Sequence, residues 1–353
     1  MSQYWTDLVH KLDPYIPGEQ PQDQQYVKLN TNENPYPPSP KVTATIDNYN
    51  KDHLKLYPDP ESTQLRQALA QRFGVQQDNV FVGNGSDEVL AHSFQAFFKQ
   101  SKPLVFPDLS YSFYPVYCGL YEIESKTIPI NEDFSININD FDIDNGGIII
   151  PNPNAPTSML MPLADIEQLC KNNSSVVIID EAYIDFGGES AIPLTRKYDN
   201  LLVIQTFSKS RSLAGLRLGY AIGHKDLIEG LNRVKDSFNS YPIDSLAQTA
   251  AVSSIEDDSY FQQTCQKIVQ TREQASEQLT RLGFKVLPSA ANFFFACHES
   301  RSAQELYSEL KKAGVLVRYF NKPRIDNYLR ITIGTEQEMQ KLIATLSKIL
   351  QQN

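Results

Sequence analysis

Short apolar runs that alternate with helical segments constrain the fold of this chain most. They cover residues 80–82, 104–106, 148–150, 176–179 and 201–204, and each is only three or four residues long. Runs of this length between helices are typical of strands that are buried on both faces, as in a parallel sheet covered by helices. This part of the sequence therefore predicts an α/β fold with a mostly parallel central sheet flanked by helices.

The chain changes character after Tyr241 and Pro242. A polar helical stretch at 244–282 is followed by expected strands at 284–287, 292–296, 315–318 and 328–333, with one helix after the second strand and another at the end. This order predicts a smaller α+β domain. Two capping boxes, Ser302 with Glu305 and Thr335 with Glu338, indicate where its helices begin.

Residues 13–60 are rich in proline, which predicts an extended arm rather than regular structure. We expect three parts: an N-terminal arm at 1–40 that joins the small domain, a large α/β domain at 41–254 and a small α+β domain at 255–353. A length of 353 residues agrees with about two domains.

Composition argues against several classes of function. The formal net charge is −10, and no cluster of lysine and arginine is dense enough to grip a nucleic acid. The longest apolar runs are strand-length, so no membrane span is expected. The four cysteines lack a CxxC spacing, which argues against a disulfide framework and against a metal site. Residues 1–11 lack the apolar core of a signal peptide, so we expect a cytoplasmic protein.

A glycine turn follows the first expected strand, in the order Gly83-Asn84-Gly85-Ser86-Asp87. A helix that starts here would leave backbone N–H groups free at the positive end of its dipole, which suits phosphate. The segment is not a Walker loop or a dinucleotide fingerprint, because it lacks the Gly-Lys-Ser/Thr of the first and the third glycine of the second. An ordinary tight turn capped by Ser86 or Asp87 is the alternative.

Two later strands end in residues that can carry chemistry. Asp180 closes the run at 176–179, where ligands of open α/β sheets bind, and a buried carboxylate there needs a cationic partner. Lys209 follows the run at 201–204 among hydroxyl side chains, and Arg217 lies eight residues later. Taken singly, Asp180 is also compatible with a helix cap, and Lys209 with a solvated surface charge.

Pyridoxal phosphate would use all of these groups, because its aldehyde needs a lysine, its ring nitrogen a carboxylate, and its phosphate helix-end amides, hydroxyls and a guanidinium. The stretch 206–220, Thr-Phe-Ser-Lys-Ser-Arg-Ser-Leu-Ala-Gly-Leu-Arg-Leu-Gly-Tyr, resembles the lysine signature of the fold-type I pyridoxal-phosphate aminotransferases. Segments 13–18, 28–36, 57–59 and 328–335 are similar to those of the histidinol-phosphate aminotransferase family. The resemblance implies the fold-type I architecture and a homodimer.

The resemblance also implies a role for each matching residue. Lys209 would form a Schiff base with the cofactor and then move the proton between substrate and cofactor carbons. Asp180 would pair with the pyridinium nitrogen, and Tyr183 would bond the ring oxygen. Tyr111 would stack on the ring, with simple aromatic packing as the alternative, and Tyr57 would reach into the partner's site. The phosphate-binding residues would be Gly85, Ser86, Asp87, Thr206, Ser208 and Arg217.

One segment departs from the family's pattern. The usual Asn-Pro-x-Asn-Pro-Thr-Gly reads Asn-Pro-Asn-Ala-Pro-Thr-Ser at 152–158, which places Ala155 where an asparagine normally bonds the ring oxygen. We expect Asn154 to substitute, with Asn152, or Tyr183 acting alone, as alternatives. Ser158 in place of glycine also raises the question whether the turn needs a positive φ.

The resemblance assigns the substrate pocket to residues near both ends of the chain. Arg330 matches the arginine that binds a substrate carboxylate, and Arg318 lies one expected strand earlier. Two arginines on neighbouring strand ends suit a substrate phosphate or the two carboxylates of glutamate, although each alone is compatible with a surface ion pair. Tyr15, Asn34 and Asn292 are further expected lining residues.

The reaction implied is transamination between histidinol phosphate and 2-oxoglutarate in histidine biosynthesis, which yields imidazole-acetol phosphate and glutamate. In the biosynthetic direction glutamate is the amino donor. An aromatic or broad-specificity aminotransferase would use the same cofactor residues. A threonine-phosphate decarboxylase and a non-catalytic cofactor-binding relative are further alternatives, and the presence of Lys209 argues against the last.

Overall fold

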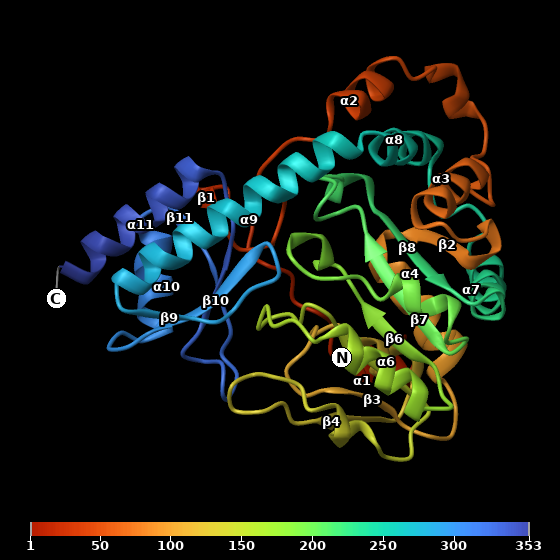
Figure 1. The fold of residues 1–353 in the computed structure, drawn as a ribbon, viewed down its shortest axis with the longest axis horizontal. Helices are drawn as coiled ribbons and strands as arrows, with labels where there is room; N and C mark the ends of the chain where they lie inside the picture. The colour runs from red at the N-terminus through yellow and green to blue at the C-terminus, as the bar shows by residue number, and fades with distance from the viewer. Residues whose placement is uncertain (1, 352–353) are drawn as a thin grey trace.

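The chain folds around two main sheets, which lie on opposite sides of Figure 1. The structure is a computed structural model and describes residues 2–351. Within these residues the larger sheet has seven strands in the order β2-β8-β7-β6-β5-β3-β4. Their bounds are β2 (Val80–Asn84), β3 (Leu104–Pro107), β4 (Ser125–Ile128), β5 (Gly147–Pro151), β6 (Val177–Asp180), β7 (Leu201–Thr206) and β8 (Leu218–Gly223).

Neighbouring strands of the larger sheet are parallel except at β8, which runs antiparallel to both β2 and β7. The prediction of a mostly parallel central sheet is therefore confirmed. The five expected runs correspond to β2, β3, β5, β6 and β7. The sequence reasoning missed β4, whose first three residues are exposed, and β8, which lies inside the lysine signature.

Alternate side chains of the larger sheet pack against two helical layers. Ile148 and Ile150 share a core with one layer, and Ile149 shares a core with the other. All three are fully buried, as expected when helices cover both faces of a sheet. The first layer holds α2 (Pro40–Asp47), α3 (Thr63–Phe73), α6 (Leu163–Asn172) and α8 (Ser245–Glu256), and the second holds α4 (Gly85–Ser93), α5 (Tyr114–Tyr121) and α7 (Lys225–Phe238).

The smaller sheet is antiparallel, in the order β12-β13-β10-β9. Its strands are β9 (Phe284–Val286), β10 (Phe293–His298), β12 (Arg318–Tyr319) and β13 (Leu329–Thr332), and it packs against α9 (Asp258–Arg281), α10 (Ala303–Lys312) and α11 (Glu336–Gln351). The capping box before α11 is present, since Glu338 N–H donates to Thr335 Oγ1 and Thr335 N–H donates to Glu338 Oε2. The expected helical stretch at 244–282 is interrupted, because α8 ends at Glu256 and α9 begins at Asp258.

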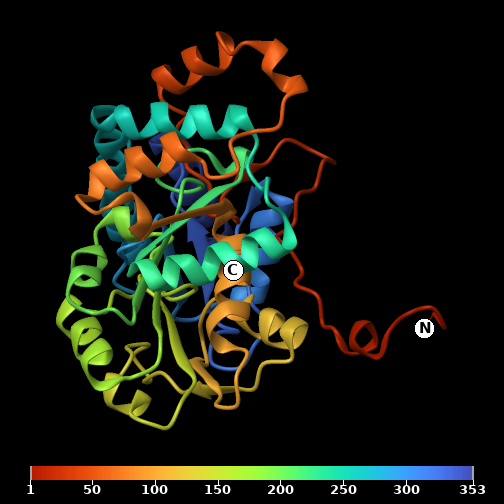
Figure 2. The ribbon, with the colours of Figure 1, turned by 90° about the vertical axis from the view of Figure 1, so that its right-hand side faces the viewer.

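The N-terminal segment connects the two sheets. Its first helix, α1 (Asp7–Lys11), lies away from the rest of the chain in Figure 2. The chain then adds β1 (Val27–Lys28) in parallel to β11 (Val315–Leu316), next to the smaller sheet. It continues through residues 29–39 to α2, which packs on the larger sheet. The expected strand at 315–318 is thus divided between β11 and β12. A search of residues 2–351 finds no helix long and apolar enough to cross a membrane.

Candidate active site

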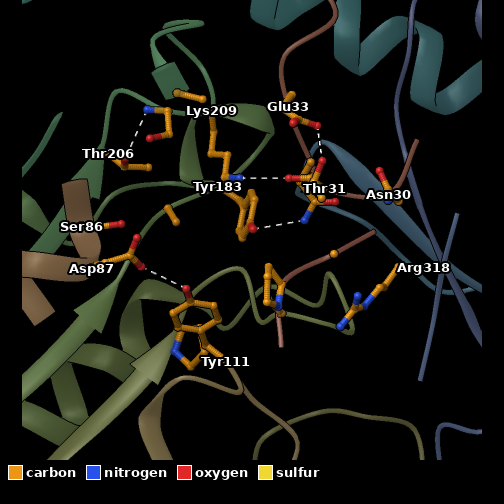
Figure 3. A pocket seen from close by; sticks show the side chains of 18 of the residues that line it. Asn30, Thr31, Glu33, Ser86, Asp87, Tyr111, Tyr183, Thr206, Lys209 and Arg318 are labelled. Atoms are coloured by element: carbon orange, nitrogen blue, oxygen red, sulfur yellow. Dashed lines mark hydrogen bonds between the residues drawn. The ribbon is translucent and has the colours of Figure 1, made fainter. Parts of the chain in front are cut away.

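A cavity of about 290 Å³ opens where the carboxyl ends of β6 and β7 meet the start of α4 and the smaller sheet. This is the edge at which open α/β sheets bind ligands. Figure 3 shows side chains from both ends of the chain converging on it. The predicted site residues that line it are Tyr15, Ser86, Asp87, Tyr111, Asp180, Tyr183, Thr206, Ser208, Lys209, Arg217, Arg318 and Arg330.

Lys209 reaches into the cavity from the loop that follows β7. Its Nζ lies 3.3 Å from the carbonyl oxygen of Thr31 and 5.7 Å from the centre of the Tyr183 ring (Figure 3). Asn34 stabilises this loop, because its Nδ2 donates to the carbonyl oxygens of Lys209 and Ser210. The amine is thus free of any carboxylate contact among residues 2–351 shorter than 4 Å, and its nearest hydrogen-bond partner is a neutral carbonyl.

Asp180 is a buried carboxylate at the end of β6. It accepts hydrogen bonds from the hydroxyl of Tyr114 at 3.0 Å and from the backbone N–H of Ala182 at 3.3 Å. Burial nevertheless raises its pKa to about 6, and no lysine, arginine or histidine of the described chain forms an ion pair with it. Such a group is stabilised by a cation supplied from outside the chain.

The start of α4 forms a cradle for an anion. Gly85 has a φ of +79°, and a Cβ on this residue would lie 2.5 Å from Nη2 of Arg217. Gly219 on β8 meets the same turn, where a Cβ would lie 2.3 Å from the backbone nitrogen of Ser86. Glycine at both positions therefore lets the guanidinium and the β8 backbone lie against the first turn of the helix. The cradle presents helix-end N–H groups and a guanidinium together, as phosphate requires.

Asp87 organises the side chains around this cradle. One carboxylate oxygen accepts from Nη2 of Arg217 at 2.8 Å. The other accepts from the hydroxyl of Tyr111 at 3.0 Å (Figure 3). Burial raises the pKa of Tyr111 well above its usual value, so its hydroxyl stays a donor. The Tyr111 ring consequently stands at the cavity wall, held by its hydroxyl at one end.

Two arginines occupy the end of the cavity that faces the smaller sheet. Arg318 on β12 and Arg330 on β13 are paired in register, so their side chains lie on adjacent strands. Arg330 is half-buried and its Nη2 donates to the carbonyl oxygen of Asn30 at 2.9 Å, while its Nε is buried and has no partner within residues 2–351. Burial lowers the pKa of this guanidinium, which indicates an unbalanced cation. The pair can bind a phosphate or a carboxylate.

Five predicted residues lie outside the lining of the cavity. Gly85 shapes the cradle through its backbone, and Asn34 holds the lysine loop. Asn292 is fully buried and donates to the carbonyl oxygen of Asn32. Tyr57 is 83% exposed and stacks on Tyr241 at 4.8 Å. Asn154, the fifth, belongs to the segment that departs from the family's pattern.

That segment presents Ala155 to the cavity and turns Asn154 away from it. Nδ2 of Asn154 donates to the carbonyl oxygen of Leu109 and to Oγ1 of Thr157. Asn152 is also engaged elsewhere, since it exchanges hydrogen bonds with the backbone of Met161. Ser158 has a φ of +63°, so the turn does adopt the left-handed conformation that glycine favours. The structure therefore brings only Ala155 of this segment to the cavity wall.

Several lining residues were not predicted. The lining includes Asn30, Thr31, Asn32 and Glu33, which lie in the segment after β1. Tyr114 does not line the cavity but donates to Asp180, and it was not predicted either. The density of polar residues in Leu-Asn-Thr-Asn-Glu-Asn, within the expected extended arm, was the available signal for the first four. Tyr114 carried none, because it is one of several tyrosines in an aromatic stretch.

The residues present fit pyridoxal phosphate. A lysine amine, an unbalanced buried carboxylate and an anion cradle that only glycine permits face one cavity. Lys209, Asp180 and the turn with Arg217 would hold the aldehyde carbon, the ring nitrogen and the phosphate respectively.

Comparisons with known proteins give the same picture. A family model described as aminotransferase class I and II matches residues 24–346. Histidinol-phosphate aminotransferase 1 of Hydrogenovibrio crunogenus is 60% identical over 351 residues, which cover 99% of each chain. Histidinol-phosphate aminotransferase of Aromatoleum aromaticum is 57% identical over 355 residues, 99% of this chain and 100% of that one. The solved structure of histidinol-phosphate aminotransferase from Sinorhizobium meliloti, in complex with pyridoxal-5'-phosphate, shares the fold with a TM-score of 0.89 at 22% identity, and the match covers 100% of this chain and 99% of that one.

Proposed function

Since this chain belongs to the class I and II aminotransferases, and to the histidinol-phosphate aminotransferases among them, we propose that it transfers an amino group between glutamate and imidazole-acetol phosphate in histidine biosynthesis. The reverse half-reactions consume histidinol phosphate and 2-oxoglutarate. When bound, pyridoxal phosphate carries the amino group and draws electrons from the substrate's Cα–H bond.

The observation that carries this proposal is that the Lys209 amine and the Asp180 carboxylate line the same cavity without contacting each other. Lys209 would hold the cofactor through its aldehyde carbon, and its free amine would be the group that moves a proton between the substrate's Cα and the cofactor's former aldehyde carbon. Asp180 would hold a proton on the ring nitrogen of the cofactor, and that positive charge would offset the electrostatic cost that burial imposes on the carboxylate.

The two arginines explain how one site can accept two different substrates. Arg330 is half-buried and has an unpaired Nε, so it binds a carboxylate of glutamate. Arg318 lies beside it on the next strand and, with Tyr15 from the N-terminal segment, meets either the phosphate of histidinol phosphate or the second carboxylate of glutamate. Both substrates carry anionic groups, a phosphate in one and two carboxylates in the other, which suits a cavity with two guanidinium groups at one end.

We propose further that the enzyme acts as a homodimer in which Tyr57 enters the partner's site. This tyrosine is 83% exposed and stacks on Tyr241, and the two segments joined by this contact carry five exposed apolar side chains. They are Leu54, Leu56, Tyr57, Phe238 and Tyr241. The division into an arm at 1–40, a large domain at 41–254 and a small domain at 255–353 belongs to the same proposal, and the break between α8 and α9 near Asp257 supports its second boundary.

The test of the substrate is the visible absorption spectrum of the purified holoenzyme, recorded before and after histidinol phosphate is added alone. We expect the band of the lysine-bound cofactor to give way to that of pyridoxamine phosphate and to return on addition of 2-oxoglutarate. Lys209→Ala is the control and should show neither band change. A band that ignores histidinol phosphate but responds to aromatic amino acids would transfer the proposal to an aromatic aminotransferase, and carbon dioxide release from threonine phosphate would transfer it to a decarboxylase.

The dimer is tested by mixing two inactive variants, Lys209→Ala and Tyr57→Ala, under conditions that exchange subunits. If Tyr57 serves the partner's site, one of the two sites in a mixed dimer has both residues intact, and activity returns. Activity that stays absent in a verified mixed dimer would confine Tyr57 to its own subunit.

A further inference from the structure

Asn32 contacts Tyr183 inside the cavity, and this contact gives the replacement of asparagine by Ala155 a specific consequence. We propose that Asn32 is a positioning residue that aims the Tyr183 hydroxyl at the ring oxygen of the cofactor, and that it does so because position 155 supplies no donor of its own. The inference rests on the proposed function, since it concerns how the same site holds pyridoxal phosphate.

The first observation is a directed chain of hydrogen bonds from β13 to the cavity. The hydroxyl of Thr332 donates to Oδ1 of Asn32 at 3.0 Å, and Nδ2 of Asn32 donates to the hydroxyl oxygen of Tyr183 at 3.1 Å. The backbone N–H of Asn32 donates to Oγ1 of Thr332 at 3.0 Å, which leaves the Thr332 proton for Oδ1. The orientation of the Asn32 amide is therefore set, with its N–H group toward Tyr183.

This chain of bonds determines where the proton of Tyr183 goes. Its oxygen already accepts from Asn32, so its own O–H is directed away from the amide. Tyr183 lines the cavity, and the amine of Lys209 lies 5.7 Å from its ring centre. The O–H group of Tyr183 is consequently available to donate into the part of the cavity that the ring oxygen of a lysine-bound cofactor would occupy.

Asn32 is itself held rigidly. It is 1% exposed and has a φ of +57°, a conformation that asparagine tolerates better than most residues. Nδ2 of Asn292 donates to its carbonyl oxygen at 3.0 Å. Neither its backbone nor its side chain can reorient without breaking these bonds, as a positioning residue requires.

The second observation is the chemistry at position 155. Ala155 lines the cavity and packs in one small cluster with Phe293, against which Tyr183 also packs, edge to face at 5.0 Å. Ala155 and Tyr183 thus border the same part of the cavity, but the methyl group cannot donate a hydrogen bond. A ring oxygen here would depend on the tyrosine alone, and the aim of that tyrosine would matter more than in a site with two donors.

The sign of the expected effect follows from what a donor does to the ring oxygen. This oxygen shares a proton with the nitrogen of Lys209 when the cofactor is bound, and it becomes an anion when that proton leaves. A donor from Tyr183 stabilises the anion and therefore lowers the pH at which the proton is lost. Misdirecting Tyr183 raises that pH, whereas a second donor lowers it.

The experiment is a pH titration of the visible absorption of the bound cofactor in the holoenzyme, without substrate. Asn32→Gly removes the amide and keeps the positive φ, and it should raise the midpoint by about 0.5 to 1 pH unit, the size that weakening one hydrogen bond produces. Asn32→Asp replaces the donor by an acceptor that captures the Tyr183 proton, so its midpoint should rise by more than that of the glycine variant. Ala155→Asn should lower the midpoint in the otherwise unchanged protein and reverse the rise caused by Asn32→Gly.

Tyr183→Phe tests whether Asn32 acts through the tyrosine. We expect Asn32→Gly to add no further shift when Tyr183 is already phenylalanine, because the same hydroxyl has been lost. Asn200→Gly is the matched control for loss of a structural asparagine. Asn200 lies directly before β7, at the opposite end of that strand from Lys209, and its Nδ2 donates to three backbone carbonyl oxygens. Its replacement should not move the midpoint of the titration.

The outcomes separate this inference from the proposed function. A normal cofactor band whose midpoint is the same in wild type, Asn32→Gly and Asn32→Asp would overturn the role of Asn32 alone. Additive shifts from Asn32→Gly and Tyr183→Phe would do the same. A wild-type protein that forms no lysine-bound cofactor band would instead overturn the proposed function. If the Asn32 variants do not fold, an unchanged midpoint in Ala155→Asn would still reject the dependence on a single donor.

Discussion

The phenol oxygen of Tyr114 lies 3.0 Å from Oδ2 of Asp180, and both side chains are buried. The contact joins the first residue of α5 to the last residue of β6. Burial raises the pKa of Tyr114 well above its usual value, so the hydroxyl acts as a permanent donor to the carboxylate. Tyr114 therefore supports the ionised form of Asp180, which the ring nitrogen of the cofactor requires.

Tyr114→Phe should raise the pKa of Asp180 above its present value of about 6, because the carboxylate loses a charge-assisted donor and keeps its burial. The acidic limb of the pH profile of kcat/KM should move upward by about one unit, and kcat/KM at pH 7 should therefore fall roughly 2-fold. Tyr121→Phe, on the same helix but without contact to Asp180, is the control. Superimposable profiles for Tyr114→Phe and wild type would remove the hydroxyl from the support of Asp180.

Asp180→Asn should stabilise the cofactor-free protein while it weakens cofactor binding. The pKa of Asp180 is about 6 in the folded protein and about 4 in an unfolded chain, so the folded state holds a proton that the unfolded state releases between these values. Stability from this group therefore falls as pH rises through 4 to 6. We expect the variant to gain roughly 2 to 3 kcal/mol in urea unfolding at pH 8 and much less at pH 4. Equal gains at both pH values would contradict this explanation.

Gly85→Ala should loosen the anion cradle. The added methyl group would lie 2.5 Å from Nη2 of Arg217, at a backbone φ of +79° that alanine adopts only with strain. The dissociation constant of pyridoxal phosphate, measured by equilibrium dialysis, should rise by about 10- to 100-fold because the guanidinium is displaced from the phosphate. Gly119→Ala on α5 is the control, since a Cβ there meets no atom within 4 Å and the affinity should be unchanged.

Arg330→Met should separate substrate binding from stability. Methionine retains the contacts with Phe293 and Phe320, whose ring centres lie 5.5 and 5.6 Å from the guanidinium carbon, but it removes the charge. The KM for glutamate should rise between about 30- and 1000-fold, the range for leaving a buried charged group unpaired. The melting temperature of the ligand-free protein should be equal or higher, because an unbalanced buried cation is gone. A lower melting temperature with an unchanged KM would make Arg330 a structural residue.

The sequence predicted those parts of the site that depend on local order along the chain. Asp180 is the last residue of a buried strand, and Gly85 and Lys209 lie one and three residues after the ends of two others. Parallel strands bring their carboxyl ends to one edge, so strand positions alone place these residues together. The arm that supplies Asn32 was predicted only as extended. Its contact with Thr332 joins residues 300 positions apart, and no periodicity along the chain reports a contact of that kind.

Two further differences have local physical reasons. The sequence pattern did not distinguish β8, although all six of its residues are buried. Two of the six are glycines and Arg217 comes directly before the strand, so no continuous apolar run marks it. Asn154 was expected at the cavity because it is adjacent to Ala155. Adjacent side chains in a tight turn point in different directions, however, and the amide of Asn154 donates to the carbonyl oxygen of Leu109 and to Oγ1 of Thr157. Side-chain direction within a turn depends on backbone angles that composition does not specify.

The position of the cavity's two halves along the chain also implies an order of assembly during synthesis. Asp180, Lys209 and Arg217 all precede the break between α8 and α9, whereas Arg330 and Thr332 lie on the last strand to be made. Domains tend to fold as units as they leave the ribosome, N-terminal part first. A nascent chain can therefore complete the cradle for the cofactor while the arm that carries Asn32 still awaits its partner strand, and the capacity to bind an amino acid is the last to arise.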